Sequence, residues 1–176
     1  DSHTCTYGAI NSASTGVGST DLAVAIFTGK LWFKVPQSLK FHLEGALKKG
    51  VFSKDIILFL IKEMGADGAN YLSCEFYGPV IDNLSMEARF TISNMAIEMG
   101  AKFGLMNADK KAIDWVRKHS HKSFEPVVAD KDAIYINVLN YNLSNLSPQV
   151  AKPHQVDNVS PIEEVEGTPI QQGVIG

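Results

Sequence analysis

Apolar residues recur at helical spacing in several stretches of the chain, each bounded by residues that commonly begin or end helices. The clearest stretch follows the potential cap Ser53, places apolar residues on one face up to Met64, and ends at Gly65. Similar patterns predict the remaining helices, over 19–29, 86–99 and 109–119. Residues 1–18 are mostly small or polar, so we expect them to form a loop that leads into the first helix.

Shorter apolar runs between these helices predict strands, because they alternate with polar residues or are rich in β-branched and aromatic side chains. They cover 31–35, 39–43, 74–77, 103–106 and 134–141, with a terminal strand at 173–176. Strands that alternate with helices predict a layered α/β fold with a mixed or largely parallel sheet. From residue 144 onward the chain has little periodicity and many Pro, Asn and Ser residues, which indicates a linker.

The composition is that of an ordinary globular protein, since 45% of the 176 residues are hydrophobic and 20% are charged. A net charge of −3 with scattered basic residues argues against a nucleic-acid partner. No apolar run approaches the roughly 20 residues needed to cross a membrane. Cys5 and Cys74 lack the close spacing of a zinc or redox motif, so we expect a reducing, cytoplasmic setting. The chain lacks an initiator Met and begins inside a polar motif, so its ends are predicted to be cuts within a longer protein.

The opening run places a carboxylate, a hydroxyl and an imidazole on successive residues, Asp1, Ser2 and His3. Small residues follow, and these would let the backbone approach a ligand closely. Neighbours in a loop point in different directions, so the three cannot form a hydrolase triad among themselves. One interpretation is an active-site segment whose members find partners elsewhere in the chain. The other is a capped turn in which Asp1 and Ser2 bind backbone amides.

A second group of polar residues lies on the predicted helix 86–99. Asn94 and Glu98 are four residues apart and would project from one face, among apolar neighbours. A buried carboxylate needs a partner, so Glu98 is expected either to meet a cation or imidazole or, near the helix end, to reach water. Arg89 could likewise be a solvated residue of this helix. The turn 16–19 resembles a phosphate-binding loop because it precedes a predicted helix, but it lacks the full motif. A role of its small residues in close packing is the better interpretation.

Several segments of the chain, in their order and spacing, resemble the aconitase family. They are DSHTCTYG, TGVGSTDLA, GKLWFKVP, LSMEARFTISNMAIEMGA and PHQVDNVSP. The combination of DSHT with NMAIE is specific where either motif alone is not. Within the family, the chain is similar to the large subunit shared by isopropylmalate isomerase and homoaconitase. The continuation CTYG after DSHT, in place of Thr-Pro-Asn, favours these split enzymes over single-chain aconitase.

This resemblance implies aconitase-like layered α/β domains and a domain division of the chain. By this comparison, residues 1–35 are the C-terminal part of a first domain and residues 36–151 form a second one. Residues 152–176 would be a linker and the first strand of a third domain.

The resemblance also implies roles for individual residues. The active-site Asp-Ser-His segment of the family falls on Asp1, Ser2 and His3, and its cluster-helix Asn and Glu fall on Asn94 and Glu98. His3 and Glu98 should then lie within hydrogen-bonding distance, where they could hold and shuttle the proton of the departing water. Asp1 would orient a second histidine from upstream sequence. Ser2 and Asn94 would contact the substrate, Ser2 through a substrate carboxylate.

The reaction implied by the resemblance is a dehydration followed by a rehydration, which moves a hydroxyl between adjacent carbons of a malate-like acid. The cofactor is a 4Fe-4S cluster with one open iron, and its cysteine ligands are expected beyond Gly176. A small subunit is the implied protein partner, and isopropylmalate or homocitrate and homoaconitate are the implied substrates. By itself the fragment is expected to be inactive.

Two alternatives to this interpretation are a dehydratase of substituted malates and a cluster-free, RNA-binding relative of aconitase. The second would require salt-sensitive RNA binding, and the absence of a basic patch in the sequence argues against it.

Overall fold

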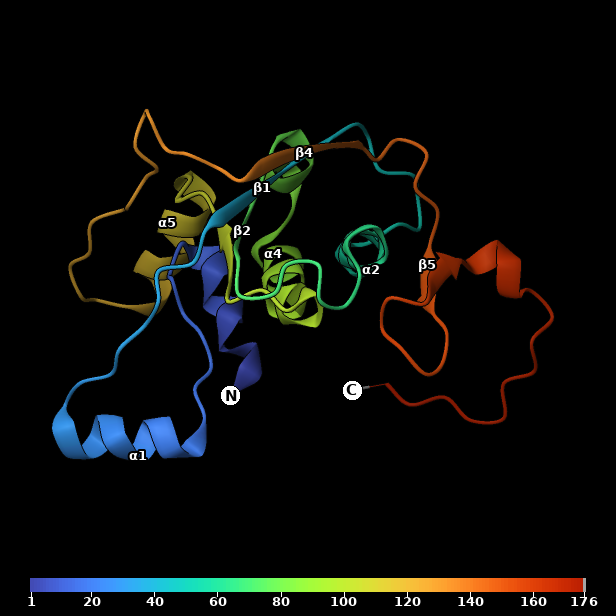
Figure 1. Cartoon of the computed structure of the whole chain (residues 1–176). Helices are drawn as coiled ribbons and strands as arrows, with labels where there is room; N and C mark the ends of the chain where they lie inside the picture. The colour runs from blue at the N-terminus through green and yellow to red at the C-terminus, as the bar shows by residue number, and fades with distance from the viewer. Residues whose placement is uncertain (176) are drawn as a thin grey trace.

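A sheet of four parallel strands forms the centre of the computed structural model, which describes residues 1–175. The strands are β1 (Ser38–Glu44), β2 (Ser73–Tyr77), β3 (Phe103–Met106) and β4 (Asn137–Asn142). They lie in the order β3-β2-β1-β4 (Figure 1). The predicted α/β fold with a largely parallel sheet is confirmed, and β1 to β3 lie where the sequence places them. The strand predicted from residue 134 begins at 137.

The helices are of two kinds, α and 3-10. The α-helices are α1 (Ser19–Thr28), α2 (Ser53–Met64), α3 (Pro79–Asn83), α4 (Met86–Met95) and α5 (Lys110–His119). The 3-10 helices are η1 (Ser2–Ile10), η2 (Ala96–Met99) and η3 (Ile162–Val165). A small antiparallel pair, β5 (Gln149–Ala151) and β6 (Val159–Pro161), follows the main sheet.

One face of the sheet carries the main core, because alternate side chains of each strand point to the same side. On β1 these are Leu39, Phe41 and Leu43, and on β2 they include Phe76, whose ring stacks on Phe41 with centroids 5.2 Å apart. Helices α2 and α4 pack together and cover this face (Figure 1). Burial of this apolar surface is the principal force that holds the sheet and helices together.

The first turn of α2 is fixed by a carboxylate. Phe52, not Ser53, is the residue that precedes the helix, and its backbone N–H donates to Asp55 Oδ2 at 2.7 Å. Asp55 Oδ1 accepts a second bond, from the backbone N–H of Gln149, also at 2.7 Å. Asp55 is buried but well satisfied, and it ties the start of α2 to β5.

Other sequence predictions assigned the wrong kind of secondary structure to a segment. Residues 31–35 and 173–175 form no strand, and residue 176 lies outside the described part of the chain. The predicted opening loop contains η1, and the predicted linker contains the β5–β6 pair. A strand needs a neighbour to satisfy its backbone groups, and apolar runs such as 31–35 have none here.

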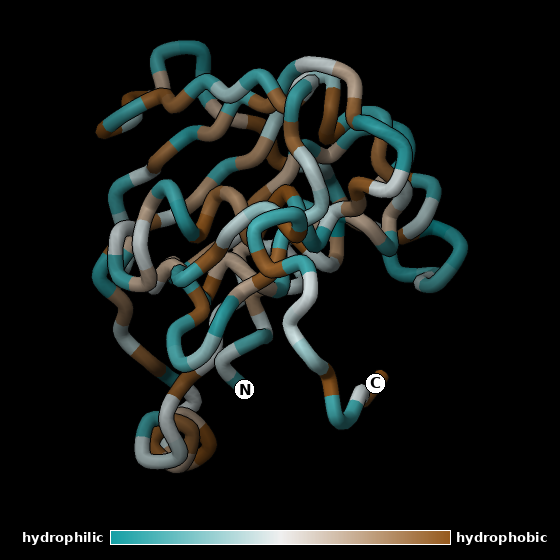
Figure 2. Tube along the Cα trace, turned by 90° about the vertical axis from the view of Figure 1, so that its right-hand side faces the viewer, coloured by the Kyte–Doolittle hydropathy of each residue, from teal (hydrophilic) through white to brown (hydrophobic). Residues whose placement is uncertain are grey.

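Helix α1 lies apart from the sheet and its covering helices (Figure 1). None of its residues is buried, although it is rich in apolar side chains, and Phe27 is 92% exposed. Figure 2 shows the hydrophobic colouring of this helix below the body of the molecule. Among residues 1–175, no helix has the length and apolar character required to span a membrane.

Candidate active site

The segment that carries Asp1, Ser2 and His3 opens the 3-10 helix η1. Asp1 caps this helix, because its Oδ1 accepts the backbone N–H of His3 at 2.6 Å. Thr4 Oγ1 donates to the Asp1 carbonyl at 2.7 Å and tightens the same turn. Nine consecutive 3-10 residues make an unusually long run, since this geometry rarely persists beyond three or four residues. Tertiary contacts must therefore hold η1 in place.

Those contacts are with α4 and β3. The Cys5 thiol donates to the carbonyl oxygens of Ser93 and Asn94, at 3.2 and 3.4 Å. Gly8 lies so close to β3 that a Cβ atom there would come within 1.9 Å of the Gly104 carbonyl oxygen. Small residues at these crossing points allow the backbones to touch, and this brings the start of η1 against the end of α4.

Helix α4 changes character where it meets η1. The sequence predicts one helix over 86–99, but the α-helix ends at Met95 and continues as η2. Gly100, with φ of 80°, closes η2 and donates its N–H to the carbonyls of Ala96 and Ile97. Asn94 belongs to the last turn of α4 and Glu98 to η2, so their relative placement is set by this junction rather than by the regular spacing of one α-helix.

His3 and Glu98 lie within hydrogen-bonding distance across this contact. His3 Nε2 is 3.4 Å from Glu98 Oε1, although the residues are 95 positions apart in the sequence. On the other side of the ring, Ser2 Oγ is 3.1 Å from His3 Nδ1. A proton on Nε2 satisfies both contacts, since Nε2 then donates to the carboxylate and Nδ1 accepts from the hydroxyl. The side chains of His3 and Glu98 are 42% and 35% exposed, so both can be reached from outside.

The remaining predicted residues differ in how firmly they are held. Asn94 Nδ2 donates to Thr6 Oγ1 at 2.9 Å, which attaches it to η1. Asp1 has an 80% exposed side chain, and its Oδ1 is 3.8 Å from His3 Nδ1. Within residues 1–175, Asp1 contacts no second histidine. The geometry thus brings together His3, Glu98 and Asn94, with Ser2 beside them and Asp1 as the cap.

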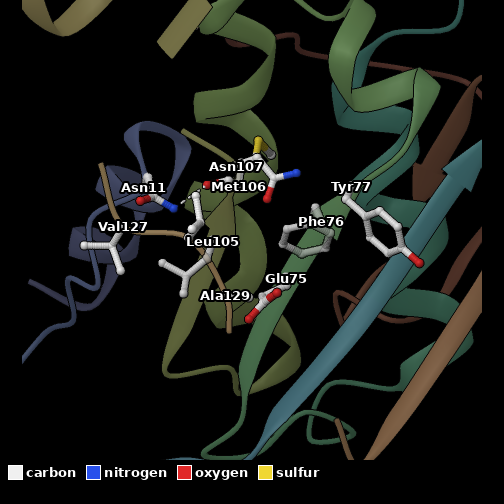
Figure 3. A pocket seen from close by; sticks show the side chains of 10 residues that line it. Asn11, Glu75, Phe76, Tyr77, Leu105, Met106, Asn107, Val127 and Ala129 are labelled. Atoms are coloured by element: carbon white, nitrogen blue, oxygen red, sulfur yellow. Dashed lines mark hydrogen bonds between the residues drawn. The ribbon is translucent and has the colours of Figure 1, made fainter. Parts of the chain in front are cut away.

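A cavity of about 350 Å³ opens next to Ser2. Its other lining residues include Tyr71, Gly100 and Lys102, which precede β2 and β3, so this cavity is at the amino ends of those strands. A second cavity of about 180 Å³ lies at their opposite ends, near Tyr77 and Asn107 (Figure 3). None of the five predicted site residues lines that second cavity.

Solvation, the possibility raised for Arg89 from the sequence, is not what the structure shows. Only 1% of its surface is exposed, and its guanidinium makes a bidentate pair with Asp109, at 3.0 and 2.6 Å. Arg89 Nε also donates to the Ile81 carbonyl at 3.2 Å. The pair joins α3, α4 and α5 and supports the helix that carries Asn94. The sequence alone does not predict this ion pair, because Asp109 lies 20 residues from Arg89 and its local pattern indicates only the start of a helix.

Both cysteines of the chain are free, buried thiols. Burial raises the pKa of the Cys5 thiol, and burial raises that of Cys74 to about 12. Residues 1–175 contain no group of three or more His, Cys, Asp and Glu side chains that could hold a metal ion. The described chain therefore provides no ligand set for an iron–sulfur cluster.

The thiols give a direct prediction. We expect alkylation of Cys5 and Cys74 at pH 8 to be on the order of 100-fold or more slower in the native protein than in urea, because a raised pKa and burial both remove reactive thiolate. Mass spectrometry of the peptides that contain each cysteine measures this ratio. Rapid labelling of either cysteine in the native protein would contradict the buried, protonated state.

Comparison with known proteins assigns the chain to a family. Residues 1–174 match the sequence profile of the Aconitase family (aconitate hydratase). The chain is 49% identical to the probable 3-isopropylmalate dehydratase large subunit of Methanothermobacter thermautotrophicus and 51% identical to the probable methanogen homoaconitase large subunit of Methanosarcina mazei. It is also 51% identical to the 3-isopropylmalate dehydratase large subunit of Clostridium kluyveri. These alignments cover the whole chain but only 42%, 45% and 42% of the respective relatives, so the chain spans less than half their length. This match over nearly its full length shows that the chain belongs to the aconitase family.

Proposed function

We propose that this chain is part of the large subunit of an aconitase-type hydro-lyase, an enzyme that moves a hydroxyl between adjacent carbons of a malate-like acid by dehydration and rehydration. The observation that carries the proposal is the contact of 3.4 Å between His3 and Glu98 in a chain of this family. An imidazole and a carboxylate that share a hydrogen bond and remain accessible can hold a proton and pass it on.

In this proposal the residues of the chain divide into proton-handling and binding groups. His3 and Glu98 hold the proton of the departing water, with Nε2 and Oε1 as the atoms that exchange it. The Ser2 hydroxyl contacts a substrate carboxylate, and the Asn94 amide contacts the substrate beside it. Asp1, the cap of η1, fixes the backbone of His3 and orients a histidine that lies outside residues 1–175.

The cofactor and the partner are proposals for the whole protein. We infer a 4Fe-4S cluster whose cysteine ligands lie beyond Gly176. A small subunit completes the enzyme, as the name "large subunit" of the similar proteins suggests. Free, buried thiols support a reducing, cytoplasmic setting.

The substrate is proposed to be isopropylmalate or the homocitrate and homoaconitate pair. Relatives named for both activities match this chain about equally, at 49% and 51% identity. The test is an assay of the complete large subunit, with its small subunit, in which the unsaturated intermediate is followed by ultraviolet absorbance with each acid. Turnover of either acid supports the proposal. If enzyme with an intact cluster dehydrated neither acid, the proposal would be refuted.

A further inference from the structure

The Thr6 hydroxyl lies between two of the proposed site residues. Thr6 Oγ1 donates to the backbone carbonyl of His3 at 2.6 Å and accepts the side-chain N–H of Asn94 at 2.9 Å. Thr6 is partly buried in η1, on the side that faces α4. It is therefore the point where the His3 segment and the Asn94 side chain are joined by hydrogen bonds.

The hydroxyl also determines which way round the Asn94 amide lies. A threonine hydroxyl has a single proton, and the carbonyl of His3 can only accept. The proton is therefore committed to His3, so the hydroxyl can meet Asn94 only as an acceptor. This selects Nδ2 as the atom that faces Thr6, because a flipped amide would place two acceptor oxygens against each other.

The opposite atom of the amide, Oδ1, is free to accept a hydrogen bond. Among residues 1–175, Asn94 Oδ1 receives no hydrogen bond, and the side chain is only partly buried. An oxygen in this position accepts hydrogen bonds from hydroxyl or water donors. A malate-like acid carries one such donor, the hydroxyl group that the reaction moves.

We propose that Thr6 is a positioning residue that orients the Asn94 amide so that Oδ1 accepts a hydrogen bond from the substrate hydroxyl. This inference rests on the proposed function. It adds which partner donates and which accepts in the hydrogen bond between Asn94 and the substrate. Thr6 touches no substrate and acts through Asn94, so its loss weakens substrate binding by releasing the amide to rotate.

The test compares Thr6→Val and Thr6→Ser in the complete enzyme with its small subunit. Valine has the shape of threonine without the hydroxyl, and serine keeps the hydroxyl. We expect Thr6→Val to lower kcat/KM roughly 10- to 100-fold, mainly through KM, because the contact between Asn94 and the substrate hydroxyl is already made in the bound hydroxy acid. Thr6→Ser should stay within about threefold of wild type. The matched control is Thr91→Val on α4, whose hydroxyl bonds only to the Glu87 carbonyl of its own helix and whose loss should leave kcat/KM unchanged.

A double-mutant cycle separates positioning from general damage. If Thr6 acts through Asn94, then Thr6→Val should cost less than about threefold in kcat/KM when Asn94 is already Ala. An equal loss in both backgrounds, a loss confined to kcat, or no loss in Thr6→Val would overturn the inference. Melting temperatures identify a variant that fails to fold; if Thr6→Val does, Thr6→Ala, which also removes the hydroxyl, is compared in both backgrounds and decides. Inactive wild type would instead refute the proposed function itself.

Discussion

Glu98→Gln is expected to lower kcat of the complete enzyme about 100- to 10,000-fold, which is the usual contribution of a group that transfers a proton in the rate-limiting step. Glutamine has almost the same shape and can still accept a hydrogen bond from His3 Nε2, which is 3.4 Å from Glu98 Oε1. It cannot take up a proton at that atom. The fold should persist, since the Glu98 side chain is 35% exposed and glutamine has almost the same size.

The control for this variant is Glu87→Gln, an exposed carboxylate in the first turn of α4. It removes the same charge from the first turn of α4, whereas Glu98 lies in η2 beyond the other end of that helix, so kcat should change less than about twofold. Circular dichroism and melting temperature establish that both variants are folded. A Glu98→Gln enzyme with wild-type kcat would remove Glu98 from the proposed proton-handling site.

Asp109→Asn is expected to give the largest loss of stability, about 2 to 3 kcal/mol, because it leaves the charge of Arg89 buried without its partner. The magnitude is at the low end for a buried ion pair, since the Asp109 side chain remains 32% exposed. Asparagine can still cap α5, where Asp109 Oδ1 accepts the N–H of Ala112 at 2.9 Å. The substitution therefore isolates the loss of the ion pair.

Hydrogen exchange of peptides from α4 and α5 in the complete subunit measures this effect. Their protected amides should exchange roughly 30- to 160-fold faster in Asp109→Asn than in wild type. The control is Asp114→Asn, which removes an exposed ion pair with Lys110 on α5 and should change exchange less than about threefold. Equal exchange in wild type and Asp109→Asn would show that the Arg89 pair contributes nothing.

The same ion pair predicts a pH dependence. Burial alone would raise the pKa of Asp109, but hydrogen bonds from Arg89 and the Ala112 N–H and the Arg89 charge outweigh it, so the pKa is lowered. A carboxyl group with a lowered folded pKa stabilises the protein above its ordinary pKa of about 3.9 and loses that contribution as the pH falls through the folded value. The difference in melting temperature between wild type and Asp109→Asn should therefore be constant near neutral pH and narrow below about pH 4.

Local sequence patterns predicted the elements whose structure depends on one buried face. Strand β1 alternates partly buried and buried residues, and α2 buries Ile56, Ile57, Leu60 and Ile61, so the period of two or of 3.6 residues was directly visible. The same reasoning was wrong for 31–35, where the apolar side chains are largely exposed and no neighbouring strand is present. An apolar pattern predicts a strand or helix correctly only where its apolar side chains are buried against the rest of the chain, and those of residues 31–35 are not.

The predicted helix 86–99 shows how a local pattern can be correct in extent and wrong in geometry. Its cap, Ser85, accepts the N–H of Ala88 at 3.2 Å, and its end, Gly100, is in the left-handed conformation that glycine favours. Between them the chain changes from α to 3-10 at Ala96. Gly104 packs against this turn, and a Cβ atom there would lie 2.7 Å from the Ala96 side chain. The change therefore occurs where α4 meets η1 and β3, which no local pattern records.

The sequence by itself determined the alternation of helices and strands, the family and the residue types of the proposed site, because these depend on local periodicity and on motifs that are contiguous in the chain. The family resemblance predicted that His3 meets Glu98, and the tertiary structure places the two side chains 3.4 Å apart. Only the tertiary structure decided that Arg89 is buried against Asp109 and that Thr6 accepts a hydrogen bond from Asn94. Each of these contacts joins segments brought together by packing of the core and by close backbone approaches such as Gly8 against Gly104. The opening residues Asp1, Ser2 and His3 are thus a capped helical turn in local structure, and their contact with η2 places His3 beside Glu98.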